Sequence, residues 1–461
     1  MQISNTTFSR WSGGLLTATL MLSPVKNILA GTPVDKTPAP VAEPSGNPLS
    51  FYDGLIVFDF EERLRFEDRN NNFDFNSAKK SLTDGAWLEE RTRIGMLIQP
   101  ESWLRFYVQG QDSHEFGSQR PKIPGALGAE GDDPFDLRQL YVQVGEDKGL
   151  SVKVGRQILS YGDERLLGAF DWNNIARVWD AAKVSYVADN WWVDGFVASV
   201  VNPINYKFDR SDVLNNGGTG HDQMLSGIYF STTALECQTT DVYALYQHQH
   251  FEPLDTDFVT FGTRWKSTPG KLGPWDYDAE FAGQAGDVKG KDLSSFAGHT
   301  EVGYTLTAPW QPRFGMDFAY ATGDSNAKDG KVTTFQNLYP TNHLFYGYMD
   351  LFSWQNMENL DASFNLTPSD KFTIRFDYRA DWLATTGDAW YRANGVTMVR
   401  PITPGASNYA GSEVDLTLTY KPLKWLALQA GYSHFFAGSY LKDTGAHSDG
   451  DFVYTQVSIK F

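Results

Sequence analysis

Arginines recur at every second position in several short segments of this sequence of 461 residues. Arg63 lies two residues before Arg65, and Arg91 lies two residues before Arg93. Residues two apart in an extended strand lie on the same face. A guanidinium group is always charged and its planar fork pairs a carboxylate through two hydrogen bonds, so such a face can select an anionic solute. The candidates are Arg63, Arg65, Arg91, Arg93, Arg105, Arg264, Arg313, Arg375 and Arg379.

Carboxylates share the strand faces of these arginines and leave a second interpretation open. Opposite charges that face each other across two strands stabilise any sheet, so a single arginine can simply hold the wall. The set as a whole is better explained as a polar or ionic conduit. Trp87, Tyr107 and Tyr141 could stack on sugar rings, with wall or membrane-interface positions as the alternative. The carboxylates are Asp59, Glu61, Glu89, Asp317, Asp377, Asp381, Glu413 and Asp415.

An alternation of apolar and polar residues defines the elements that carry these side chains. Phe372, Ile374, Phe376 and Tyr378 alternate with Thr373, Arg375, Asp377 and Arg379. This period of two predicts a strand with one apolar and one polar face. About eighteen segments repeat the pattern, in agreement with the even strand counts of bacterial barrels. Their predicted centres are Phe60, Ile94, Phe106, Tyr141, Val154, Lys183, Val197, Ile228, Leu245, Phe261, Ala279, Val302, Phe318, Ala362, Phe376, Leu416, Leu428 and Val457.

Two features favour a membrane barrel over a soluble β-protein, which would also alternate. The apolar face continues along many strands with no helical segment to cover it, and after residue 30 no apolar run approaches the about 20 residues of a spanning helix. The final strand also ends in an aromatic residue, Phe461, in the manner of outer-membrane barrels. The sequence therefore predicts an all-β protein: a transmembrane antiparallel β-barrel of about 18 strands in the outer membrane of a Gram-negative bacterium, with lipid as its partner.

The chain divides into three parts. Residues 1–30 are typical of a signal peptide, with Arg10 before a short apolar core and Ala30 at the expected cleavage site. A membrane anchor is the alternative, which the shortness of the core disfavours. Residues 31–50 contain five prolines and are expected to be an extended periplasmic linker. Residues 51–461 are expected to form the barrel.

Composition and motifs exclude several classes of function. A net charge of −17 argues against a nucleic-acid partner, which requires a basic surface. A single cysteine, Cys237, excludes an intrachain disulfide and a cysteine-based metal site. The sequence contains no G-x-S-x-G, Walker or dinucleotide-binding motif, and Ser433 and His434 are neighbours that a strand points to opposite faces. We therefore do not expect an enzyme.

Asp68, Asn70, Asn72 and Asp74 place oxygen-bearing side chains at alternate positions, a spacing that can surround a calcium ion. The glycine and closing glutamate of a calcium-binding EF-hand loop do not follow, so a polar loop is the favoured interpretation. Beyond this candidate calcium site, no cofactor is expected.

Three stretches resemble the alginate export family of outer-membrane proteins. Gly155-Arg156-Gln157 with Phe170-Asp171-Trp172 is the first, and residues 321–326 with residues 338–343 form the second. The third is residues 411–420, so the likeness extends over most of residues 51–461. The resemblance implies an eighteen-stranded barrel in which an arginine-rich constriction passes an anionic uronic-acid polymer and inward loops gate it. It also implies constriction roles for Arg138 and Asp171, and Arg156 belongs to the same motif.

One departure bears on the substrate. Family members have further arginines in the stretch that corresponds to residues 343–360, where this sequence has Tyr346, Tyr348, Asp350 and Trp354 instead. The sequence therefore favours a channel for an anionic or neutral saccharide without fixing alginate itself. A general porin for small anions such as carboxylates is the alternative, and a periplasmic export partner is a further expectation.

Overall fold

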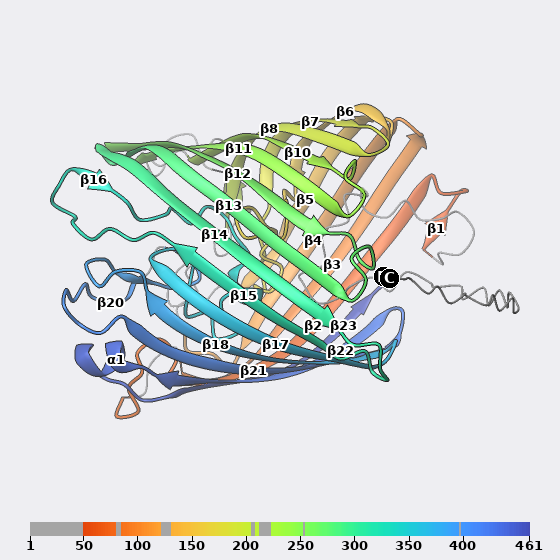
Figure 1. Ribbon diagram of the computed structural model, residues 1–461. Helices are drawn as coiled ribbons and strands as arrows, with labels where there is room; N and C mark the ends of the chain where they lie inside the picture. The colour runs from red at the N-terminus through yellow and green to blue at the C-terminus, as the bar shows by residue number, and fades with distance from the viewer. Residues whose placement is uncertain are drawn as a thin grey trace, which may run out of the picture.

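The computed structural model describes residues 49–79, 84–120, 131–203, 208–211, 223–251, 254–395 and 398–461. Within these ranges, eighteen antiparallel strands form one closed barrel (Figure 1). The barrel closes where β2 (Ile56–Asn70) pairs with β23 (Gly450–Lys460), in the register Leu64 opposite Val457. Closure leaves no free sheet edge, as a lipid environment requires. The predicted fold class is confirmed.

Every predicted strand centre falls within a barrel strand. After β2 these are β3 (Gly85–Glu101), β4 (Leu104–Phe116), β5 (Asp133–Gly145), β6 (Gly149–Gln157), β7 (Trp179–Val187), β8 (Trp191–Asn202), β10 (Gln223–Thr232), β11 (Gln238–Phe251), β12 (Leu254–Ser267), β13 (Trp275–Val288), β14 (Lys291–Thr305), β15 (Arg313–Ala321), β17 (Met357–Ser369), β18 (Phe372–Leu383), β21 (Tyr409–Leu423), β22 (Leu426–Ala437) and β23.

Seven short elements in the described ranges accompany the eighteen wall strands. They are β1 (Ser50–Phe51), β9 (Arg210–Ser211), β16 (Lys331–Val332), β19 (Trp390–Tyr391), β20 (Met398–Arg400), a 3-10 helix (Asn342–Leu344) and α1 (Ser439–Thr444). Three of them, β1, β9 and β16, pair with wall strands. No helix among the described residues is long and apolar enough to cross a membrane. The predicted signal peptide and almost all of the linker lie outside the described residues.

The outer face of the barrel is apolar along its strands. On β18, Phe376 and Tyr378 are exposed, whereas the intervening Asp377 is fully buried toward the lumen. The same alternation leaves Leu64, Ile94, Phe106, Phe314, Met316 and Leu416 exposed. Near the short turns the exposed residues include Trp103, Trp275, Trp310 and Trp425. An apolar band with aromatic residues at its edge is the surface that a bilayer requires.

Phe376→Arg is expected to destabilise the folded barrel in a bilayer by about 2–4 kcal/mol, because a guanidinium near the middle of β18 would face hydrocarbon. Thr373→Arg, on the lumen face of the same strand, is the control and should cost much less. Denaturant unfolding in lipid vesicles measures both variants. Equal costs would contradict the assignment of the two faces.

The two ends of the barrel differ in their connections. At one end β3 and β4 are separated by two residues, and so are β17 and β18. The C-terminus lies at this end, and β16, β20 and α1 lie at the opposite end (Figure 1). Short turns face the periplasm in outer-membrane barrels, so the end with the longer connections faces outward.

Two of the longer connections fold into the lumen. We call residues 158–178, between β6 and β7, the first inward segment, and residues 333–356, between β15 and β17, the second inward segment. Two backbone hydrogen bonds join them. The amide of Gly168 donates to the carbonyl of Tyr339 at 2.8 Å, and the amide of Tyr339 donates to the carbonyl of Leu166 at 2.9 Å. The segments therefore form one unit that crosses the lumen.

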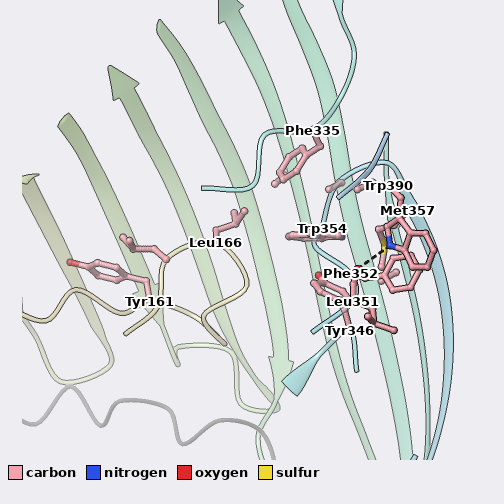
Figure 2. Close-up of a cluster of buried hydrophobic side chains, with 14 of the residues drawn as sticks. Tyr161, Leu166, Phe335, Tyr346, Leu351, Phe352, Trp354, Met357 and Trp390 are labelled. Carbon is pink, nitrogen blue, oxygen red and sulfur yellow. Dashed lines mark hydrogen bonds between the residues drawn. The ribbon is translucent and has the colours of Figure 1, made fainter. Parts of the chain in front are cut away.

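Apolar side chains fix this unit to the wall. Tyr161 and Leu166 of the first segment belong to one buried cluster with Trp354 and Trp390, and strands of the wall stand behind these side chains (Figure 2). Trp354 is fully buried, and Trp390 donates a hydrogen bond from its indole nitrogen to the carbonyl of Leu351 at 2.9 Å. The main apolar core of this barrel therefore lies inside the lumen, between the inward segments and the wall.

Candidate functional site

Inward arginines on β2 and β3 bind the backbone of the first inward segment. Arg63 donates hydrogen bonds to the carbonyl oxygens of Asp171 at 2.8 Å and Trp172 at 3.1 Å. Arg65 donates to the carbonyl of Trp172 at 2.7 Å, and Arg91 donates to that of Asp171 at 3.0 Å. All three arginines are buried. The cationic groups predicted from strand alternation thus hold a loop that the alternation did not predict.

The carboxylate of Asp171 lies at the centre of this arginine cluster. One oxygen lies 2.8 Å from Nη1 of Arg93 and 3.8 Å from Nη2 of Arg138, and the other lies 3.3 Å from Nη2 of Arg91. The side chain of Asp171 remains 45% exposed within the lumen. The structure therefore brings together two groups of candidates, those from strand alternation and those from the family resemblance: Arg63, Arg65, Arg91, Arg93, Arg138 and Asp171.

Burial raises the pKa of Asp171, but the guanidinium groups of Arg91 and Arg93 outweigh burial and hold this pKa well below its ordinary value. A carboxylate with a lowered pKa in the folded state contributes stability above its ordinary pKa of about 3.9. That contribution declines as the pH falls below about 3.9 and is gone once the pH is below the folded-state value. The contact with the arginines is therefore expected to persist in mild acid.

From neutral pH down to about pH 5, the titration of Asp171 should leave the ion selectivity of the channel unchanged. Reversal potentials recorded over this range test the expectation. A loss of selectivity that begins above about pH 5 in the natural chain and is absent from Asp171→Asn would contradict it.

Arg156, which the family motif suggested for the pore, lies outside the cluster around Asp171. Its guanidinium pairs both oxygens of Asp180, at 2.9 and 3.2 Å, and donates to the carbonyl of Asp209 at 3.0 Å. Arg156 pairs with Leu140 of β5, which is exposed on the outer face, so the strand register answers the question of its face that the sequence left open: Arg156 lies on the outer face of β6, where its neighbours bury it.

The arginine cluster lines a cavity of about 410 Å³, which we call the basic cavity. It lies on the periplasmic side of the first inward segment, where the end of β23 contributes Lys460. A second cavity of about 80 Å³, the outer pocket, lies on the outward side. The charged residues of the basic cavity are Arg63, Arg91, Arg93, Arg138, Lys460, Glu61, Glu164 and Asp171. Those of the outer pocket are Arg65, Arg69, Arg120, Arg392, Glu67, Glu89 and Asp350.

Trp172 lines both cavities and separates them. Its ring stacks on His343 of the second inward segment, with ring centroids 3.8 Å apart. The guanidinium of Arg65 lies 4.0 Å from the ring centroid, and Tyr454 of the wall meets the ring edge-on at 5.0 Å. The two inward segments therefore meet at an aromatic partition between two basic spaces.

A third cavity, of about 450 Å³, opens beside the periplasmic rim and contacts the basic cavity at Ser458 and Lys460. We call it the rim cavity. Arg375 lines it and donates to Asp377 at 2.7 Å. Other cationic residues in its lining are Arg165, Lys421 and Lys424, and the carboxylates are Glu301, Asp317 and Asp361.

Four candidate arginines face the lumen without lining these three cavities. Each is paired with carboxylates: Arg105 with Asp147, Arg264 with Asp278, Arg313 with Asp276 and Glu301, and Arg379 with Asp361, Asp377 and Asp415. For these positions the geometry favours the wall interpretation, in which opposite charges hold neighbouring strands together.

The predicted aromatic residues also lie on the lumen face. Tyr107 and Tyr141 pack with ring centroids 5.3 Å apart, and Tyr107 donates to Asp59 at 2.9 Å. Trp87 lies under the guanidinium of Arg120 at 3.8 Å. All three rings are buried in contacts of the wall.

Several cationic residues of the site escaped sequence reasoning. Arg69 continues the alternation of Arg63 and Arg65 along β2 and was therefore predictable. Arg120, Arg165 and Arg392 lie in loops, where no periodicity identifies a face. Arg165 lies 4.1 Å from the ring centroid of Phe345, so it supplies a guanidinium near the stretch that lacks the arginines of the family.

The candidate calcium loop lies at the outward end of β2. Asp68 and Asn70 are exposed on the outer face of β2, whereas Asn72 is buried. Asp74 accepts a hydrogen bond from the amide of Asn76 at 3.0 Å, a common turn contact. Calcium binding here stays a prediction.

A closed eighteen-stranded barrel with an apolar outer face and a charged lumen defines a channel of the bacterial outer membrane. The chain belongs to the alginate export family, because the sequence model of that family matches residues 55–455. The resemblance inferred from the short motifs is thereby confirmed.

Solved structures with the same fold are porins of Pseudomonas aeruginosa. OccK11 (OpdR) is 10% identical with a TM-score of 0.56, and the match covers 88% of this chain and 96% of that one. The outer membrane protein OprD is 10% identical with a TM-score of 0.57, covering 88% and 94%. OpdK with vanillate is 11% identical with a TM-score of 0.57, covering 88% and 98%. Among curated proteins, no match was found.

Proposed function

We propose that this channel passes anionic saccharides, of the class of uronic-acid oligomers or polymers, through the basic cavity. The observation that carries the proposal is the arginine cluster around Asp171. Five fixed cationic groups line the basic cavity against three carboxylates, so the cavity has an excess of positive charge. Low-dielectric walls focus such a potential onto an entering anion.

Asp171 shows how a substrate carboxylate would bind. Its carboxylate contacts three guanidinium groups from β3 and β5, at distances of 2.8 to 3.8 Å. A uronate carboxylate that entered the basic cavity would meet the same donors and compete with Asp171 for them. Such competition would loosen the first inward segment and open a passage beside Trp172. The channel would then be opened by the solute that it conducts.

Current block in planar bilayers tests this proposal. Uronate oligomers should block the current at lower concentrations than neutral gluco-oligomers of equal length, because only the uronates carry carboxylates for the arginines. Arg93→Gln should weaken the block, whereas Arg313→Gln, which removes a lumen arginine outside the three cavities, should not. Block by cationic oligomers with no block by uronates would overturn the proposal.

Small carboxylates are the second candidate substrate. The outer pocket measures about 80 Å³, too small for a sugar polymer without movement of the inward segments. OpdK, a porin with the same fold, has been solved with vanillate, which is a small carboxylate. Strong permeation by monocarboxylates, with no difference between uronate and neutral oligomers in blocking the current, would favour this alternative.

A further inference from the structure

Three potential metal ligands meet where the first inward segment contacts the wall, away from the basic cavity. Asp163 belongs to the first inward segment, Asp278 to β13 and His299 to β14. Ligand atoms of the three side chains lie within 4.8 Å of one another, and all three residues are buried. One imidazole and two carboxylates are a donor set that suits a divalent first-row transition metal.

His299 supplies independent evidence for a ligand at this place. Its side chain is fully buried, and among the described residues neither ring nitrogen has a hydrogen-bond partner of good geometry. Nε2 lies 3.7 Å from Oδ2 of Asp163, whereas Nδ1 lies 3.5 Å from Oδ1 of Asp317. In metal sites the second ring nitrogen of a ligating histidine is commonly oriented by a carboxylate. Asp317 holds that position relative to His299.

The net negative charge around these side chains also favours a bound cation. Four carboxylates and three fixed cations lie in this group, which leaves one negative charge in a buried place. The carboxylates are Asp163, Asp241, Asp278 and Asp317, and the cations are Arg165, Arg264 and Lys266. Oδ1 of Asp278 is buried and has no hydrogen-bond partner among the residues that the structure describes. Uncompensated buried negative charge is costly, and a bound cation would offset it.

We propose that Asp163, Asp278 and His299 bind a divalent transition-metal ion such as Zn²⁺, with Asp317 as a positioning residue for His299. Because Asp163 lies on the first inward segment while the other two ligands lie on the wall, the ion would fasten the segment to β13 and β14. This proposal is independent of the substrate proposed above.

The test uses the full-length protein without an affinity tag, folded in detergent and stripped of metal by a chelator. Zn²⁺ is titrated by calorimetry, and Co²⁺ is added to a second sample for its visible absorption bands. We expect one Zn²⁺ per chain and a Co²⁺ spectrum with a nitrogen ligand. Asp317→Asn should weaken Zn²⁺ binding by about 10–100-fold, as loss of an orienting carboxylate does in known metal sites.

His299→Gln should abolish the Zn²⁺ binding and the Co²⁺ bands. His434→Gln is the matched control, because His434 also lies beside two aspartates, with Nδ1 2.8 Å from Asp451 and Nε2 3.9 Å from Asp449, but outside the site. Equal Zn²⁺ binding by the natural chain and His299→Gln would overturn the proposal. So would the absence of stoichiometric Zn²⁺ binding in the natural chain, a result that does not depend on whether any variant folds.

Discussion

Replacing Trp172 with alanine is expected to raise single-channel conductance several-fold. The Trp172 ring is the side chain that the basic cavity and the outer pocket share, and it packs against His343, Arg65 and Tyr454. Removing the ring would join the two basic spaces while leaving in place the backbone carbonyl to which Arg65 donates. Conductance in planar bilayers measures the effect.

Trp172→Phe is the control for this prediction, because a phenyl ring can still stack on His343. We expect its conductance to stay close to that of the natural chain. Equal conductance of Trp172→Ala and the natural chain would show that ions pass elsewhere, for instance through the rim cavity beside the second inward segment. Heat resistance of the folded band in gels would confirm that both variants form the barrel.

Replacing both Arg91 and Arg93 with glutamine is expected to abolish the preference of the channel for anions. The basic cavity would then hold three fixed cations against three carboxylates, and Glu61 and Asp171 would lose their main partners. Glutamine keeps much of the side-chain length and can still donate to backbone carbonyls. The reversal potential in a salt gradient measures the change.

Arg105→Gln with Arg313→Gln is the matched control for the loss of two lumen charges. Both arginines face the lumen outside the three cavities, and of their carboxylate partners, Asp147, Asp276 and Glu301, only Glu301 lines a cavity, the rim cavity. We expect this control to keep most of the anion preference. If both double variants shifted the reversal potential equally, selectivity would arise from the total charge of the lumen and not from the cluster around Asp171.

The wall could be predicted from the sequence because each strand carries its own evidence. Between Phe372 and Asp381 of β18, the alternation places every apolar residue outward and every charged residue inward, with no reference to distant parts of the chain. Lipid outside and charge inside act on every strand alike, so the period of two persists over the whole barrel.

The interior could not be predicted in the same way. Asp171 meets Arg91 across 80 positions of sequence, and Trp172 meets His343 across a still longer separation. These contacts depend on how two irregular segments fold into the lumen, and irregular backbone has no period that assigns a face. The family resemblance identified Arg138 and Asp171, but the partition at Trp172 and the group around His299 required the structure.

The sign of the reversal potential of the natural channel in a potassium chloride gradient tests the central claim most directly. The account predicts that chloride carries most of the current, because the conducting path passes the arginines around Asp171, and that added uronate reduces this current. If instead the reversal potential had the sign expected for potassium permeation, and added uronate did not change the current, the assignment of the basic cavity as the conducting path would be contradicted.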